Sequence, residues 1–300
     1  MNCKSFLLAL IAATASVPVQ SRAADPAPHT RITELEYVGY WVRDIEKVRA
    51  FYISYLGFEE TYDLLFPTGG LQLIVLKVNE DQCLIFFPNP AKILPNGDNQ
   101  DHFGLVNDNS LALTKELVAK GVKAPPPHKA RLGDTTFTIK DPDGRAYEIT
   151  QFEPDGQLLL HRGKNLPSSR ISSRLRTATV MVSNLDASLA FYVGKVGFRE
   201  VARYGAGDTQ EVELKVPDGD GSGITLKPFT VAAGQPAPHA VPDYTLEVPD
   251  VAQAVETLNH RADVGGFPKP GPITVGLNGK RQTSLIDPDG TEIVLMEVGR

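Results

Sequence analysis

Hydrophobic positions along the chain alternate between strand and helix periods, and the same order of elements occurs twice. Residues 35–42 have the pattern of a strand, and after Asp44 the apolar side chains fall at helical spacing until Gly57. Asp44 suits a helix N-cap, because its short side chain can accept hydrogen bonds from unpaired backbone amides. Two apolar runs follow at 71–78 and 83–87, so this stretch is predicted to form a βαβββ unit.

A second unit follows within the first half. Residues 102–106 are typical of a strand, 110–120 of a helix that ends at Gly121, and 135–140 and 146–152 of two further strands. The tetrapeptide Asp-Pro-Asp-Gly joins the last two strands, and its proline and glycine are typical of a tight turn. We interpret these aspartates as turn residues and not as catalytic groups.

The whole arrangement returns 140 residues later, when Tyr37 is aligned with Thr177. Asn184 takes the capping position of Asp44, and Asp-Pro-Asp-Gly returns at 287–290. The second half is completed by a strand at 244–248, a helix from 251 to about 260, and strands at 281–286 and 292–298. A repeat of this length predicts two domains of the same plan.

These patterns divide the chain into five segments. The prediction is a signal peptide at 1–23, an N-terminal tail at 24–30, a first domain at 31–155, a polar linker at 156–170 and a second domain at 171–300. Lys4 precedes the apolar run 6–15, which has the length of a signal peptide and is too short to span a bilayer. We therefore expect an exported protein, periplasmic or extracellular, with no membrane attachment once the signal is removed.

Composition and charge narrow the range of partners. The chain is 42% hydrophobic and 22% charged, and its formal net charge of -6 includes no basic block. A nucleic-acid partner therefore has no electrostatic support, and a small molecule is the expected ligand. Gly205 and Gly207 lack the third glycine of a dinucleotide site, so no nucleotide cofactor is expected. Cys83 is the single thiol outside the signal peptide, so no intramolecular disulfide can form.

The recurring motifs resemble those of the vicinal oxygen chelate superfamily. Each half begins with a strand, a capped helix containing Ala-Phe-Tyr, and then Gly-Phe, and each half ends with Asp-Pro-Asp-Gly. The superfamily includes glyoxalase I, extradiol dioxygenases and bleomycin resistance proteins. The resemblance implies an α+β fold in which four βαβββ units form two tandem cup-shaped domains.

The resemblance also implies a divalent metal on the inner face of a cup. The family's ligand positions fall on Tyr37, Ile85, His102 and Glu148 in the first half, and on Thr177, Thr225, Asp243 and Val294 in the second. His102 and Glu148 are good metal ligands, whereas tyrosine is a poor ligand unless it is deprotonated. We expect Tyr37 to bind metal or to donate a proton, and His102 has the alternative of a histidine held at a strand edge. The second half is expected to be degenerate.

Strand alternation places a further side chain beside Tyr37. Trp41 lies four residues along the same strand, so it projects from the same face and would contribute an aromatic wall to a substrate pocket. Packing in the core is the alternative for Trp41. His128 follows three prolines and could reach the mouth of the cup as an acid, base or substrate contact, with an exposed loop position as the alternative.

Two classes of function follow from the resemblance. The first is an exported metal-dependent lyase, isomerase or ring-cleaving dioxygenase that acts on a small oxygenated substrate with Fe(II), Mn, Ni or Zn as Lewis acid. Glu148 and His102 favour this class. The second is a non-catalytic small-molecule-binding protein without metal, similar to the resistance proteins that sequester a compound. Tyrosine at the first ligand position favours the second class, and both are compatible with a homo-oligomer.

Overall fold

Two eight-stranded sheets form the protein, one from each half of the chain. The computed structural model describes residues 30–94, 98–207, 210–219, 221–229 and 243–298, so the expected signal peptide and most of the N-terminal tail lie outside the described residues. The first half contains β1 (Ile32–Val42), α1 (Ile45–Arg49), η1 (Ala50–Tyr55), β2 (Glu60–Leu65), β3 (Leu71–Lys77), β4 (Cys83–Pro88), η2 (Pro90–Lys92), β5 (Gln100–Asn107), α2 (Ser110–Ala119), β6 (His128–Lys129), β7 (Thr135–Lys140) and β8 (Ala146–Gln151). A short helix, α3 (Gln157–Leu160), lies in the segment expected as a linker.

The second half repeats this order. It contains β9 (Leu175–Val182), α4 (Leu185–Phe191), η3 (Tyr192–Val196), β10 (Arg199–Tyr204), β11 (Glu211–Lys215), β12 (Gly223–Pro228), β13 (Asp243–Val248), α5 (Val251–Gly265), β14 (Thr274–Val275), β15 (Arg281–Ile286) and β16 (Glu292–Glu297). In the described residues no helix is long and apolar enough to span a bilayer.

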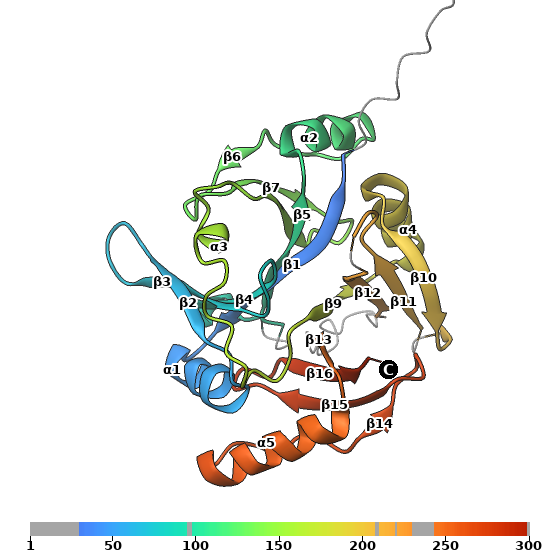
Figure 1. Ribbon diagram of the computed structural model, residues 1–300. Coiled ribbons are helices and arrows are strands. Elements are labelled where there is room, and N and C mark those ends of the chain that lie inside the picture. The colour runs from blue at the N-terminus through green and yellow to red at the C-terminus, as the bar shows by residue number, and fades with distance from the viewer. Residues whose placement is uncertain (1–29, 95–97, 208–209, 220, 230–242, 299–300) are drawn as a thin grey trace, which may run out of the picture.

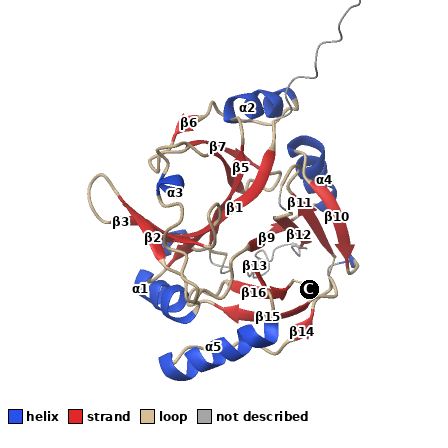
Figure 2. Ribbon diagram, viewed as in Figure 1, coloured by secondary structure: helices blue, strands red, loops and turns tan. Residues whose placement is uncertain are grey.

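The two sheets have the same topology. The strand order is β2-β3-β4-β1-β5-β8-β7-β6 in the first and β10-β11-β12-β9-β13-β16-β15-β14 in the second. In each, the opening strands of the two βαβββ units pair antiparallel at the centre, and each is flanked by the last strand of its own unit in parallel. This confirms the predicted α+β fold of two tandem cups, seen as two curved sheets in Figures 1 and 2.

One continuous core joins the two halves. Alternate residues of β1, such as Val38 and Tyr40, are fully buried in it, and Ala178 and Val180 of β9 join the same cluster. β1 and β9 lie close together near the centre of the molecule (Figure 1). Because the other face of each sheet points away from this core, each cup has its own interior.

The repeated motifs meet across the two halves. The hydroxyl of Tyr52 donates to Asp287 at 3.0 Å, and the hydroxyl of Tyr192 donates to Asp141, also at 3.0 Å. Both aspartates begin an Asp-Pro-Asp-Gly turn, in which the glycine amide donates back to the aspartate carbonyl. The turn interpretation is therefore confirmed, and each turn also accepts a hydrogen bond from the helix of the opposite half.

The capping predictions hold, but the helices that follow are not α-helical throughout. Asp44 accepts hydrogen bonds from the amides of Glu46 and Lys47. After Arg49 the segment η1 is a π-helix, in which the amide of Leu56 donates to the carbonyl of Phe51 at 2.9 Å. The wider turn also occurs in η3, so it belongs to the repeated plan and places the tyrosines that reach the opposite turn.

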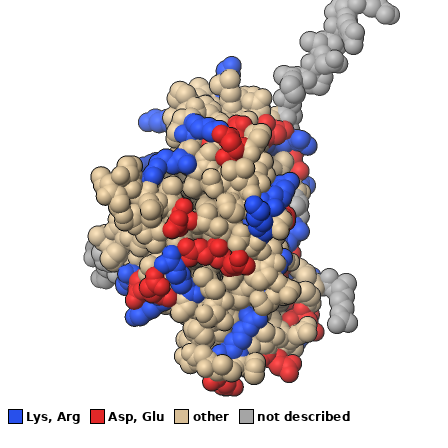
Figure 3. Space-filling view, turned by 60° about the vertical axis from the view of Figure 1, so that its left-hand side comes forward, with Lys and Arg blue, Asp and Glu red and all other residues tan. Residues whose placement is uncertain are grey.

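Charged side chains on the surface are mixed in sign. On the face shown in Figure 3, basic and acidic residues lie in small adjacent groups. Among the described residues, exposed ion pairs include Arg162 with Asp81 and Lys129 with Asp155. Exposed pairs of this kind add little to stability, because water screens them.

Candidate functional sites in the two cups

The first cup is the concave face of the sheet of the first half, and its centre is occupied by Tyr37. Tyr37 is 3% exposed, and its hydroxyl donates to Oε1 of Glu148 on β8 at 3.1 Å. The His102 ring meets the Tyr37 ring edge-on, with 5.3 Å between the ring centroids. The structure thus brings together three of the four residues at the family's ligand positions, and the fourth, Ile85, lies in the same buried cluster as Tyr37.

A glycine makes room for the tyrosine ring. Gly104 pairs with both Tyr37 and Glu148, and a Cβ atom at this position would lie 2.2 Å from the Tyr37 ring. Real atoms do not approach so closely, so any side chain at Gly104 would displace the ring. The Tyr37–Glu148 hydrogen bond therefore depends on this glycine.

Burial keeps Tyr37 protonated. The pKa of its hydroxyl is raised well above the ordinary value, mainly because the ring is removed from water and also because of the negative charge of Glu148. A neutral phenol that donates its proton to a carboxylate is a hydrogen-bond donor and not an anionic ligand. At ordinary pH Tyr37 is thus a neutral hydrogen-bond donor.

His102 is a partly exposed polar group of the first cup. Its side chain is 20% exposed, and Nδ1 lies 2.7 Å from Oδ2 of Asp101. An imidazole anchored through one nitrogen leaves the other directed elsewhere, here available to a ligand.

The first cup has fewer conventional metal ligands than the metal centre that the fold family implies. His102 and Glu148 are conventional ligands, but the third residue at the site is a neutral tyrosine whose proton is committed to Glu148. Within the described ranges no group of three or more His, Cys, Asp or Glu residues is arranged to hold a metal ion. A catalytic metal usually has three protein ligands, so these residues do not fit that role.

Glu36 is a buried acid of the first cup that the sequence did not reveal. The pairing of β1 with β5 shifts between Leu35 and Tyr37, and this β-bulge directs Glu36 toward Thr150 on the concave face. Glu36 is 6% exposed, and among the described residues its Oε2 has no hydrogen-bond partner. Burial raises its pKa well above the ordinary value, an effect that the Thr150 hydroxyl partly offsets.

Trp41 packs against another aromatic side chain of the first cup. Its ring packs on Phe87 of β4 with centroids 5.0 Å apart, and Phe87 in turn lies 5.9 Å from the His102 ring. Trp41 remains partly exposed, so its side chain is accessible at the opening of the cup. His128 lies on the short edge strand β6 opposite Thr136 and is exposed, which separates it from the Tyr37 group.

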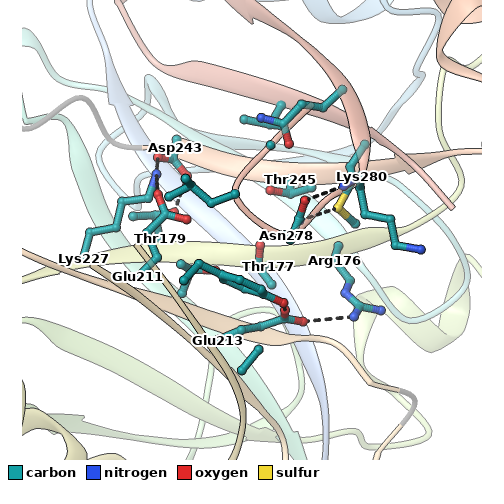
Figure 4. Close-up of a pocket in the computed structure, with 18 of the residues that line it drawn as sticks. Arg176, Thr177, Thr179, Glu211, Glu213, Lys227, Asp243, Thr245, Asn278 and Lys280 are labelled. Atoms are coloured by element: carbon teal, nitrogen blue, oxygen red, sulfur yellow. Dashed lines mark hydrogen bonds and ion pairs between the residues drawn. The ribbon is translucent and has the colours of Figure 1, made fainter. Parts of the chain in front are cut away.

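The second cup contains an open cavity of about 540 Å³. Its lining comes from all eight strands of the second sheet and from the loop before β15, and Figure 4 shows threonine hydroxyls between two groups of charged side chains. The four positions equivalent to the family's ligands, Thr177, Thr225, Asp243 and Val294, all line this cavity. Three of the four are not metal ligands of ordinary strength. The second cup has therefore lost the ligand residues of the family, as expected, but it keeps the cavity.

Comparison with known proteins identifies the family. The sequence pattern of the Glyoxalase/Bleomycin resistance protein/Dioxygenase superfamily matches residues 34–149 and 174–295, and the chain belongs to this superfamily. No curated protein matches the chain in sequence.

Solved structures of similar fold include enzymes. The Mn(II)-bound glyoxalase of Novosphingobium aromaticivorans has a TM-score of 0.66 at 18% identity, with 90% of this chain and 83% of that chain covered. The 2,2',3-trihydroxybiphenyl 1,2-dioxygenase of Sphingomonas wittichii has a TM-score of 0.64 at 15% identity, covering 90% and 91%. A variant of homoprotocatechuate 2,3-dioxygenase from Brevibacterium fuscum has a TM-score of 0.65 at 15% identity, covering 92% and 74%. At these identities the likeness establishes the fold.

Proposed function

We propose that the chain is a dioxygenase- or glyoxalase-like protein that binds a small oxygenated molecule in the first cup without a resident metal. The observation that carries this proposal is the hydrogen bond from Tyr37 to Glu148, placed beside His102 and the partly exposed Trp41. These groups combine a hydrogen-bond donor, Tyr37, and an acceptor, Glu148, with the flat apolar surface of Trp41. Ligand pockets commonly have this composition.

The residues suggest how such a ligand is held. A ligand hydroxyl that inserts between Tyr37 and Glu148 accepts the tyrosine proton and donates its own to the carboxylate. His102 supplies a further polar contact from β5, and Trp41 covers one face of the ligand. Because burial keeps Tyr37 protonated, these contacts are hydrogen bonds from an intact phenol, and the arrangement supports binding of the ligand.

The test uses Trp41, which is the single tryptophan of the chain. Metal-free protein is titrated with catechol, and the tryptophan fluorescence is followed. We expect a saturable change that is weakened about tenfold in Tyr37→Phe and in Glu148→Gln, because each substitution removes one hydrogen bond. A response that needs added metal, or one that is unchanged in both variants, would refute the proposal.

A metal-dependent lyase, isomerase or dioxygenase is the second candidate. The convergence of His102 and Glu148 on one cup face favours it, as does the fold shared with a Mn(II)-bound glyoxalase. When bound, Fe(II), Mn, Ni or Zn would supply Lewis-acid chemistry to a chelated substrate. Stoichiometric metal lost on both His102→Ala and Glu148→Ala substitution would establish this candidate in place of the first.

Export and self-association complete the proposal. The cationic start and the apolar run 6–15 support a cleaved signal peptide and a periplasmic or extracellular site of action. Fractionation of cells expressing the full chain, with mass determination of the N-terminus, tests this. A homo-oligomer remains part of the proposal, and sedimentation of the purified protein tests it.

A further inference from the structure

We infer that the second cup is a separate binding site for a neutral polyhydroxylated molecule such as a sugar or an alditol. The cavity has the size of ordinary ligand pockets, about 540 Å³, and it lies in the half of the chain that contributes nothing to the first cup. The inference therefore does not depend on the proposed function of the first cup.

Hydroxyl groups cover the floor of this cavity. Thr177 on β9 pairs directly with Thr245 on β13, and Thr179 on β9 pairs with Thr225 on β12, so the four side chains form two adjacent rows on the concave face. Among the residues that the structure describes, the hydroxyls of Thr177, Thr225 and Thr245 have no hydrogen-bond partner. Each can therefore donate one hydrogen bond and accept others from a ligand.

On one wall a single lysine is paired with two carboxylates. Lys227 lies 2.8 Å from Asp243 and 3.3 Å from Glu211, and Asp243 also accepts a hydrogen bond from Thr179. The pKa of Lys227 is raised by these two carboxylates although burial opposes the shift. The ammonium group is thus fixed and compensated, as Figure 4 shows on the left of the cavity.

A second compensated group lies across the floor. Arg176 is 3.0 Å from Glu213 and 3.0 Å from Glu247, and the hydroxyl of Tyr204 donates to Glu213 at 3.1 Å. These contacts hold the guanidinium and the carboxylates in place. Their N–H groups and oxygens that are not used in the ion pairs therefore point in fixed directions toward a ligand. Such fixed polar groups select a ligand by its hydrogen-bonding pattern and not by its net charge.

Two other lysines line the cavity, and one of them is directed away from its floor. Lys215 and Lys280 line the cavity without an ion pair to a described residue, but Lys280 is exposed and its side chain points away from the threonines in Figure 4. One half-buried lysine, Lys215, is left to hydrogen-bond a ligand. A carboxylate ligand would meet cations that are already paired, and an apolar ligand would leave the threonine hydroxyls without partners.

A polyol satisfies these groups best. Its hydroxyls both donate and accept, as the threonines do, and its C–H faces suit the apolar residues at the margin, such as Val201, Leu277 and Met296. At the positions that correspond to Thr177 and Thr225, the first cup presents Tyr37 and Ile85, which belong to a buried cluster of aromatic and apolar side chains. The two cups therefore have different chemistry on the same scaffold.

Calorimetric titration of the whole chain with D-glucose and D-glucitol tests the inference, with acetate and cyclohexanol as comparison ligands. We expect a polyol to bind, and its affinity to fall about tenfold in Thr177→Val and in Thr245→Val, each of which removes one hydroxyl at nearly constant shape. Thr138→Val, on the exposed part of β7, is the matched control and should bind as the wild type does.

Three results would overturn the inference: no binding of either polyol up to its solubility limit, equal affinity in both cavity variants, or preference for acetate or cyclohexanol. Thermal unfolding of each variant confirms that the fold is intact. Because the titration does not involve Trp41, its outcome is separable from the catechol experiment on the first cup.

Discussion

Substitution of Asp287 by asparagine should remove one titrating group from the pH dependence of stability. Asp287 begins the second Asp-Pro-Asp-Gly turn and is 4% exposed. Its carboxylate accepts the Tyr52 hydroxyl and the amides of Asp289 and Thr291 at 3.0, 2.9 and 2.8 Å. Burial outweighs these hydrogen bonds and raises the pKa of Asp287 to about 6 from an ordinary value of 3.8.

The raised pKa gives both the sign and the size of the effect. The folded protein holds this proton more tightly than the unfolded chain does, so the carboxyl contributes stability below about pH 4, and that contribution is lost as the pH rises through about 6. The difference between a pKa of about 6 in the folded protein and the ordinary value of 3.8 corresponds to about 3 kcal/mol of unfolding free energy. Asp287→Asn cannot ionise, so relative to the wild type it should gain up to about 3 kcal/mol between about pH 4 and about pH 7.5.

Urea unfolding of both proteins across this pH range measures the difference. Subtraction of the two curves removes the contributions of all other titrating groups, as long as these are unchanged by the substitution. Glu80→Gln is a control of opposite sign, because a hydrogen bond from Lys77 lowers the pKa of Glu80. That variant should be less stable than the wild type above about pH 4.5, and the difference should shrink as the pH falls below that value. A constant difference between Asp287→Asn and the wild type would refute the account of this turn.

Four further substitutions test other parts of the structure. Gly104→Ala should cost about 1–3 kcal/mol in urea unfolding and weaken catechol binding, because the added methyl displaces the Tyr37 ring, and a neutral outcome would contradict the close approach. Tyr37→His should tighten metal binding measured by calorimetry, because it supplies a third conventional ligand, and unchanged affinity would reject the equivalence of this position with the family's ligand. Glu36→Gln should gain stability relative to the wild type as the pH rises in urea unfolding, because burial raises the pKa of Glu36 and ionisation therefore destabilises the folded protein, and a difference that does not change with pH would contradict this. Tyr192→Phe should lower the unfolding free energy by about 1 kcal/mol through the lost bond to Asp141, and no change would mean that the bond is dispensable.

Much of the fold could be predicted from repeated local signals, because the central strands are apolar and the helices carry clear caps. The edge strands were not located in this way. β2 and β10 are mostly half-exposed, so their side chains carry little of the alternation that marks a buried face. α5 also runs on to Gly265, beyond its expected end near residue 260, since Gly266 is the first residue there with a left-handed backbone, at φ 71°.

The first site was predicted in part and the second was not. Tyr37, His102 and Glu148 meet because their positions follow from regular strand pairing. Glu36 could not be assigned, since regular alternation places it on the face opposite Tyr37 and only the bulge brings it into the cup. The cavity of the second half depends on threonines and compensated ion pairs, whose common residue types give no signal until the strands bring them together.

The metal content of the purified protein tests the central claim most directly. The full chain, processed in its host, is incubated separately with Fe(II), Mn, Ni and Zn, freed of loose ions and analysed by mass spectrometry beside His102→Ala and Glu148→Ala. The account predicts well under one equivalent of each metal and no difference between the wild type and the two variants. Near-stoichiometric metal that both substitutions abolish would contradict it and would make the first cup a Lewis-acid centre.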